Sequence, residues 1–109
     1  MFEKRYKDCM LAVKGYETYY HDGEGYSHST DGAISVLKGS EYSGGGIKVS
    51  ILGLGFSKIK VKIEYKGKTT IHDMKKGDTI LVDSHDNSHG ADESAHIDQK
   101  ELYVRLVTL

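Results

Sequence analysis

The sequence predicts an all-β fold, a small sandwich or partly open barrel of about six to eight strands with one short helix at the amino terminus. Apolar and polar residues alternate through the middle of the chain, as expected for half-buried strands. The chain also has 13 glycines for turns, no proline, and eight tyrosines that can provide large contact surfaces. A length of 109 residues allows one modest core, so we expect a single β-rich domain over residues 1–109.

The first segment combines apolar residues at helical spacing with charged residues between them. These apolar residues are Phe2, Tyr6, Cys9, Met10 and Val13. Their spacing predicts an amphipathic helix of about three turns that ends at Gly15, although a strand over residues 2–14 remains the alternative. The one cysteine, Cys9, lies in this apolar stretch and is expected to be a small buried residue rather than a nucleophile.

A hairpin is predicted next, because residues 16–21 read as a strand and end at Asp22-Gly23. An Asp-Gly pair readily adopts the positive φ angles of a type I′ turn, which would lead into a returning strand at Tyr26. A further strand is expected at Ala33–Leu37 after the turn signal Asp31-Gly32. The triplet Gly44–Gly46 predicts a flexible connection.

The clearest alternation lies between residues 47 and 65. Its apolar positions are Ile47, Val49, Ile51, Ile59, Val61, Ile63 and Tyr65. A bulge or tight bend at Gly53 and Gly55 is expected to separate two strands. Lys66-Gly67 predicts a hairpin turn into a further strand.

The remaining strands are predicted from two shorter apolar stretches. Residues 79–82 form one, and residues 102–109 form the last strand, expected in the interior of a sheet because it is apolar on both faces near its end. Residues 83–100 between them show no period and are rich in Asp, Ser, His and Gly, which predicts a polar loop insertion.

This segment is also the best candidate for a metal site. His85, His89 and His96, with Asp83, offer imidazole and carboxylate ligands suited to zinc or another divalent metal, either in a metal-stabilised domain or in a metal-dependent enzyme. Their spacing lacks the His-Glu-x-x-His pattern of metalloproteases and the ligand positions of an EF-hand. A solvated loop without metal is the alternative.

A Tyr/His-rich hairpin is the candidate surface for a protein partner. It contains Tyr19, Tyr20, His21, Tyr26 and His28. Tyrosine provides rigid amphipathic contact area at a small entropic cost, as in many recognition surfaces. The alternative is that these tyrosines pack across the sheet to fill a core that has only two phenylalanines.

A third hypothesis is binding of single-stranded nucleic acid. Lys58, Lys60 and Lys62 alternate along one predicted strand and would form a basic row, with Tyr65 or Phe56 as a stacking platform. A solvated lysine face that protects the sheet against aggregation is the other interpretation.

No residue pattern predicts catalysis, and the glycine-rich stretches lack the remaining residues of a P-loop or a dinucleotide fingerprint. No apolar run is long enough for a transmembrane helix, and the start has no signal-peptide pattern, so a cytoplasmic protein is expected. The sequence therefore favours a non-enzymatic binding module, such as an adaptor, an inhibitor or an assembly subunit, that needs no cofactor. Unpaired edge strands in a small β-domain also favour a homo-oligomer.

Overall fold

Eight strands and one helical turn make up the described part of the chain. The computed structural model describes residues 2–21, 23–89 and 96–109, and for residues 21, 87–89, 96 and 97 it describes the backbone alone. The elements in chain order are the 3-10 helix η1 (Glu3–Tyr6) and strands β1 (Cys9–His21), β2 (Glu24–Ser35), β3 (Glu41–Gly44), β4 (Ile47–Leu54), β5 (Ile59–Tyr65), β6 (Lys68–Met74), β7 (Thr79–His89) and β8 (His96–Thr108).

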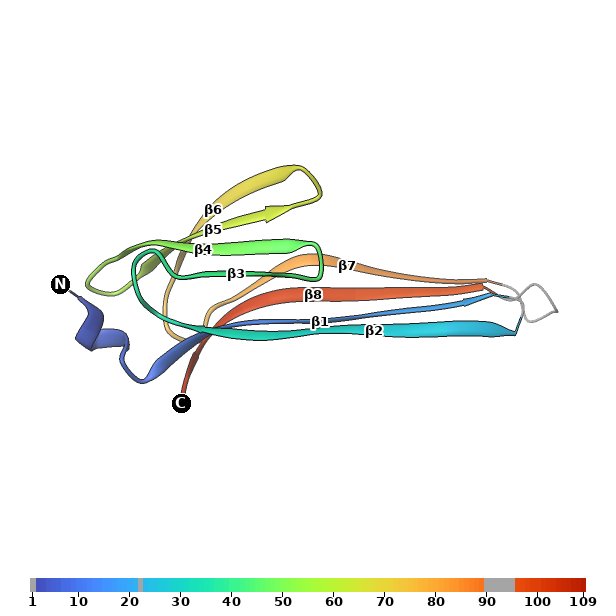
Figure 1. The fold of residues 1–109 in the computed structure, drawn as a ribbon, viewed down its shortest axis with the longest axis horizontal. Coiled ribbons are helices and arrows are strands. Elements are labelled where there is room, and N and C mark those ends of the chain that lie inside the picture. Colours follow the sequence, from blue (N-terminus) through green and yellow to red (C-terminus); the bar gives the residue numbers. More distant parts are fainter. Residues whose placement is uncertain (1, 22, 90–95) are drawn as a thin grey trace.

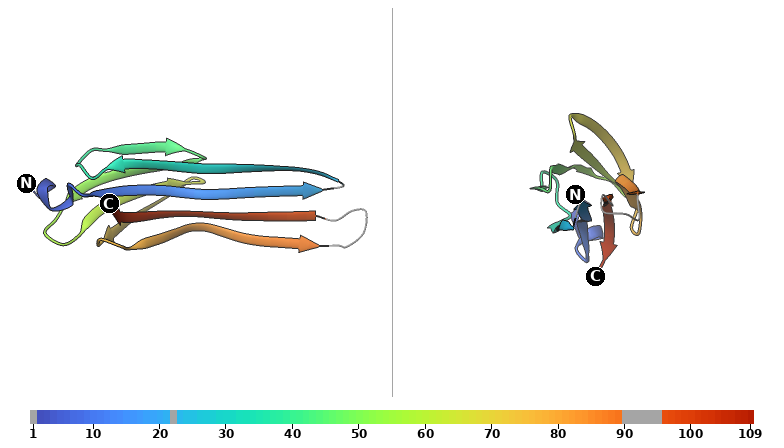
Figure 2. Two further views of the ribbon diagram at one scale, coloured as in Figure 1. Left: turned by 90° about the horizontal axis from the view of Figure 1, so that it is seen from below. Right: turned by 90° about the vertical axis from the view of Figure 1, so that its right-hand side faces the viewer.

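The strands form two antiparallel sheets stacked as a sandwich, which confirms the predicted all-β class (Figure 1). We call the sheet with strand order β2-β1-β8-β7 the long sheet and the sheet with order β3-β4-β5-β6 the short sheet. Strands of the long sheet have 11 to 13 residues, whereas those of the short sheet have four to eight. The long sheet therefore continues well past the short one, and the molecule measures 59 × 28 × 18 Å (Figures 1 and 2).

The hydrophobic core lies between the sheets only where they overlap. The long sheet contributes Leu11, Val13, Leu102, Val104 and Leu106, and the short sheet contributes Ile47, Val49, Ile51, Ile59, Val61, Ile63 and Met74. On β5, Ile59, Val61 and Ile63 are no more than 2% exposed. Lys60, between the first two, is exposed, as the two-residue period predicts. Tyr6 closes one end of the core, and its hydroxyl donates a hydrogen bond to the carbonyl oxygen of Gly55 at 2.8 Å.

The predicted amino-terminal helix is mostly wrong. Within residues 2–14, which the structure describes, only η1 is helical, and residues from Cys9 onward form β1, which pairs with β2 on one side and β8 on the other. Cys9, Leu11 and Val13 face the core at alternate positions, while Ala12 is also buried. Because residues on both faces of this strand are buried, its apolar pattern also fits helical spacing. Pairing with β2 and β8 decides in favour of the strand.

Two glycines inside these strands permit close packing rather than ending an element. At Gly15 in β1, a Cβ atom would lie 2.6 Å from the carbonyl oxygen of Glu101 on β8. At Gly32 in β2, it would collide with the ring of Tyr42 on the short sheet. The expected turn at Asp31-Gly32 and the separate strand Ala33–Leu37 are therefore wrong, because β2 continues through them as far as Ser35.

The predicted loop insertion at residues 83–100 is also corrected. Residues 83–89 belong to β7 and residues 96–100 belong to β8, and the two strands pair in register from His89 and His96 toward the core. Residues 90–95 lie outside the described residues. The strands lack an apolar period because both faces carry polar side chains, so sequence periodicity gave no signal.

Other turns and bends follow the sequence predictions. Lys66 and Gly67 have φ angles of 49° and 76°, as a tight hairpin turn between β5 and β6 requires. The pairing of β4 with β5 shifts between Ile51 and Gly53, which confirms the expected bulge. Gly45 and Gly46 form a tight turn between β3 and β4 in place of the expected flexible connection. The last strand, β8, is interior as predicted. Among the described residues, no helix is long and apolar enough to span a membrane.

Candidate functional site

The part of the long sheet that extends past the short sheet has a side that faces no other part of the described structure. We call this part of the long sheet the arm. The arm consists of residues 16–21, 24–29, 84–89 and 96–101 of the four strands (Figures 1 and 2). Coverage by the short sheet ends near Thr30, whose side chain packs so closely on Gly45 that a Cβ there would collide with it. We call the side of the arm that continues the core-facing side of the sheet the arm face.

Strand register places three rows of four residues on the arm face. Opposed residues of antiparallel strands lie on the same face, and residues two apart along a strand share it. From the core outward, the rows are His28, Glu17, Lys100 and His85; then Tyr26, Tyr19, Asp98 and Asn87; then Glu24, His21, His96 and His89. Five of the six histidines of the chain therefore map to this one face.

Side-chain contacts agree with this assignment of faces. On the arm face, the rings of Tyr19 and Tyr26 lie 5.5 Å apart between centroids, and His85 lies 3.0 Å from a carboxylate oxygen of Asp98. On the opposite face, Gln99 lies between two other side chains, 3.4 Å from Thr18 and 3.1 Å from Asp86. The two faces thus differ in chemistry: the arm face carries aromatic, imidazole and charged groups in close succession.

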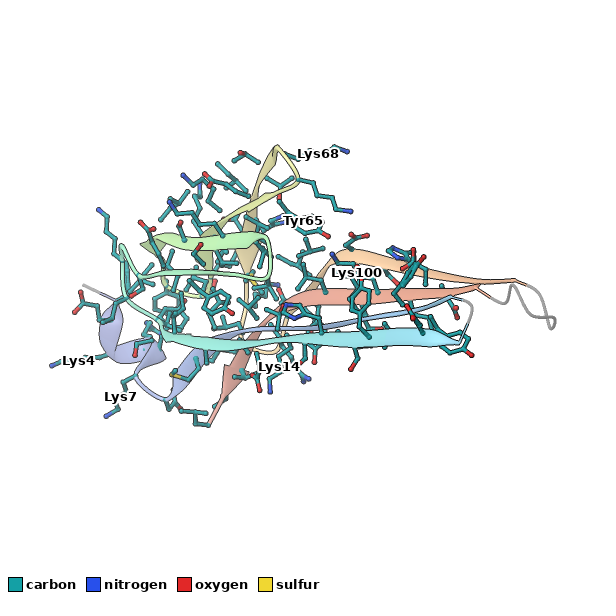
Figure 3. The ribbon with its side chains drawn as sticks, turned by 45° about the vertical axis from the view of Figure 1, so that its right-hand side comes forward. Lys4, Lys7, Lys14, Tyr65, Lys68 and Lys100 are labelled. Carbon is teal, nitrogen blue, oxygen red and sulfur yellow. The ribbon has the colours of Figure 1, made fainter. Side chains whose placement is uncertain are left out.

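A polar cluster marks the junction where the arm leaves the sandwich. The Tyr65 hydroxyl donates a hydrogen bond to Asp83 at 2.6 Å, and the ammonium of Lys66 lies 3.5 Å from the same carboxylate. Lys100 completes the cluster, since its ammonium lies 5.1 Å from the Tyr65 ring centroid and 4.0 Å from Glu17 (Figure 3). The side chain of Lys100 is only 14% exposed. The junction is therefore held by charge and hydrogen bonding instead of aliphatic packing.

These contacts shift the acidity of both hydrogen-bonded groups. Burial, followed by the hydrogen bond to Asp83, raises the pKa of Tyr65 to about 12. The same hydrogen bond is the largest cause that lowers the pKa of Asp83, and the nearby Lys66 adds to it. The pair is therefore held as a neutral phenol and an ionised carboxylate.

The five predicted partner-binding residues do not all share one face. Tyr19, Tyr26 and His28 lie on the arm face, and the backbone register places His21 there as well. Tyr20, which is 41% exposed, belongs to the opposite face with Tyr16. The predicted strands pair as a hairpin, and the two-residue period divides the five residues between its two surfaces.

Of the four predicted metal ligands, the structure describes the side chains of Asp83 and His85, and these two contact other groups. Asp83 is bound to Tyr65 and Lys66 at the junction, and His85 contacts Asp98. His89 lies six residues further along β7 than Asp83, about 20 Å at the usual rise of a strand. No group of three potential ligands converges among the side chains that the structure describes. His89 and His96, however, are directly opposed in register.

The three lysines of the nucleic-acid hypothesis lie on and beside β5. Lys60 and Lys62 are on the outer side of the short sheet, where acidic residues interrupt the basic row: Asp73 is opposite Lys60, and Glu64 is 3.3 Å from Lys62. Lys58 precedes the strand. The two proposed stacking rings are both engaged, since Tyr65 bonds Asp83 and the Arg5 guanidinium lies 3.5 Å from the centroid of Phe56.

Comparison with protein-family models, curated proteins and solved structures found no match to this chain. Five residues of the arm face were not among the candidates of the sequence analysis: Glu17, Glu24, Asn87, Asp98 and Lys100. A usable signal existed, because counting by two from buried Val13 along β1 reaches Glu17, Tyr19 and His21. The same counting reaches Asp98 and Lys100 on β8 only once residues 96–101 are known to form a strand.

Proposed function

We propose that this chain is a non-enzymatic binding domain that contacts a protein partner through the arm face. The observation that carries the proposal is the change along one side of the long sheet. This side packs aliphatic residues against the short sheet and then continues for three rows of aromatic, imidazole and charged groups. The sandwich supplies the stability, and the arm supplies the exposed surface.

The tyrosine pair is the best candidate for the centre of the contact. Tyr26 is 57% exposed and stacks beside Tyr19, so covering the pair would remove apolar ring area from water without ordering long side chains. Aromatic residues surrounded by polar groups are typical of the centre of protein interfaces.

Two of the carboxylates around the tyrosines already have partners within the arm. Lys100 lies near Glu17, and His85 lies near Asp98. Such pairs reduce the cost of desolvating single charges when a partner covers them, and they leave a face with both signs of charge. This pattern favours a protein partner over nucleic acid, which would require a predominantly basic surface.

Site-specific photo-crosslinking in cells of the native host tests the proposal. A photo-reactive residue at position 28 lies on the arm face, and one at position 71 is the matched control, because Ile71 is 58% exposed on the short sheet. We expect one dominant protein adduct from position 28 and none from position 71. Mass spectrometry of the adduct identifies the partner and distinguishes another protein from a second copy of this chain.

The same experiment with substitutions tests the role of the tyrosines. Tyr26→Ser should lower the yield of the adduct about tenfold, as expected for a residue that contributes more than about 1 kcal/mol to binding. Tyr16→Ser, which removes a tyrosine of similar exposure from the opposite face, should leave the yield unchanged. Equal adducts from positions 28 and 71, or no adduct from either, would contradict the proposal.

A further inference from the structure

The end of the sandwich opposite the arm has a basic hollow on its surface. It has a volume of about 370 Å³ and lies between η1, the connection from β4 to β5, and the turn from β6 to β7 (Figure 1). The residues that line it are Arg5, Tyr6, Phe56, Ser57, Lys75 and Lys76. These six described residues include three cations and no carboxylate, although the chain as a whole has a formal net charge of -1.

Hydrogen bonds hold the three segments around the hollow in place. The Tyr6 hydroxyl fixes η1 to the connection between β4 and β5 through its bond to the carbonyl oxygen of Gly55. In the β6–β7 turn, the Asp78 carboxylate accepts a hydrogen bond from the Lys75 amide at 2.9 Å, and the Asp78 carbonyl oxygen accepts one from the Leu106 amide of β8 at 3.0 Å. The hollow is therefore formed before a ligand arrives, which lowers the entropic cost of binding.

Arg5 is positioned in this hollow by two aromatic rings. Its guanidinium lies 3.5 Å from the centroid of the Phe56 ring, and Phe2 contacts Phe56 edge-on with the centroids 6.4 Å apart. A guanidinium stacked on a ring keeps the N–H groups at its edge available, and this planar edge matches two oxygens of a phosphate or a carboxylate. Arg5 forms no ion pair within the described part of the chain, so its charge is available to a ligand.

The two lysines of the β6–β7 turn determine which anion suits the hollow. The ammonium of Lys75 has no ion pair with a described carboxylate, and that of Lys76 has a long one, 3.8 Å from Asp8. Three cations with one distant carboxylate favour an anion of more than one charge. A phosphate monoester carries about -1.5 to -2 at neutral pH and has three acceptor oxygens, whereas a carboxylate carries a single charge.

We propose that Arg5, Lys75 and Lys76 bind the phosphate group of a small phosphorylated molecule. Arg5 donates hydrogen bonds to two phosphate oxygens, and the lysines neutralise the remaining charge. The Phe56 ring, which is 65% exposed, offers apolar contact to the rest of the ligand. The volume of the hollow is in the range of small-molecule sites, and a nucleic-acid strand would need a longer groove that follows several phosphates. The site is separate from the arm face and does not depend on the proposed protein partner.

NMR titration of the isotope-labelled full chain with inorganic phosphate tests the site. Sodium chloride at the same ionic strength is the reference, because salt screens exposed charges. We expect the amide signals of Phe56, Lys75 and Lys76 to shift and to saturate at millimolar phosphate, with no such shift in chloride. Arg5→Gln should weaken phosphate binding about tenfold, as expected for loss of charge-assisted hydrogen bonds. Lys68→Gln is the matched control, since it removes an exposed lysine at the opposite end of β6.

A second variant keeps the proposal testable if Arg5→Gln alters the fold. Lys75→Gln changes a side chain without a described hydrogen bond or ion pair, and it should weaken phosphate binding about two- to fivefold. Shifts that do not saturate, that are equal in chloride, or that weaken equally in Lys68→Gln would overturn the proposal.

Sedimentation with phosphatidylcholine vesicles that contain phosphatidic acid distinguishes a free ligand from a lipid headgroup. We expect the protein to stay in the supernatant. Sedimentation with these vesicles, without any saturable shift in inorganic phosphate, would assign the three cations to a membrane surface and contradict the small-molecule site.

Discussion

The long sheet has two halves that share the same strands and the same alternation but differ in what covers them. In the half beneath the short sheet, the inward side chains Leu11, Val13 and Val104 are fully buried. In the arm, the same side of the same strands carries Glu17, Tyr19 and Asp98. The side chains change from aliphatic to polar at the point where the second sheet ends. The arm is therefore a surface suited to water and to a ligand, and not an incomplete core.

The two halves should also differ in local stability. The covered half gains from burial of aliphatic side chains, which is the dominant favourable term in folding. The arm is held by strand pairing and by a few polar contacts, such as those that Gln99 makes with Thr18 and Asp86. Regions with few buried apolar contacts open more readily than the core. The arm can thus change its local conformation without unfolding the sandwich.

The largest expected effect comes from shortening a core side chain in the covered half. Leu106→Ala should lower the free energy of unfolding by about 2 to 5 kcal/mol, because the side chain is fully buried and would leave a cavity. Leu81→Ala is the matched control at a 60% exposed leucine, with an expected effect within about 0.5 kcal/mol. Urea denaturation measures both. Similar losses in the two variants would contradict the comparison.

An intermediate effect is expected at the junction between the halves. Tyr65→Phe removes the hydroxyl that bonds Asp83 and should cost about 1 to 2 kcal/mol near neutral pH. The folded-state pKa of Tyr65 is raised from 10.0 to about 12, so its stabilising contribution is complete below pH 10 and is lost as the pH rises through 12. The lowered pKa of Asp83 gives the opposite sign in acid: its contribution is present above pH 3.8 and is lost at lower pH.

The pH dependence is measured as the difference in unfolding free energy between wild type and Tyr65→Phe. That difference should be constant between about pH 5 and pH 9 and should shrink above pH 10, and again below pH 3.8. Ser43→Ala, an exposed change at the nearby end of the short sheet, serves as a control without a titrating group. A difference that does not change with pH would show that the stabilisation by the hydroxyl is not linked to the ionisation of Tyr65 and Asp83.

The smallest effect is expected on the arm face itself. Tyr26→Ser should change the free energy of unfolding by less than about 0.5 kcal/mol, because the ring is 57% exposed and packs only on Tyr19 among the rings described. The same variant is predicted to weaken partner binding, so stability and binding are separated in one protein. A loss above about 2 kcal/mol in thermal or urea unfolding would instead make the pair part of the fold.

The sequence predicted β4, β5 and β6 of the short sheet closely, missed β3, and predicted the long sheet only in part. The alternation of Ile59, Val61 and Ile63 identified β5, and Lys66-Gly67 identified its turn, because one face is apolar and the turn needs positive φ angles. Residues 83–100 were read as a loop because strands with polar residues on both faces lose the hydropathy period on which the prediction depends. The tyrosine hairpin was located, but the missing strands hid which of its residues share a face with His85 and Asp98.

By itself, the sequence determined the all-β class, the hairpin turn at Lys66-Gly67 and the outward position of Lys60 on β5, because each depends on neighbours within a few residues. Only the tertiary structure decided that β1 lies between β2 and β8, and with it the alignment of His21, His96 and His89 in one row. Register between distant strands is set by which residues the core buries, and a shift of one residue would move every one of these histidines to the other face.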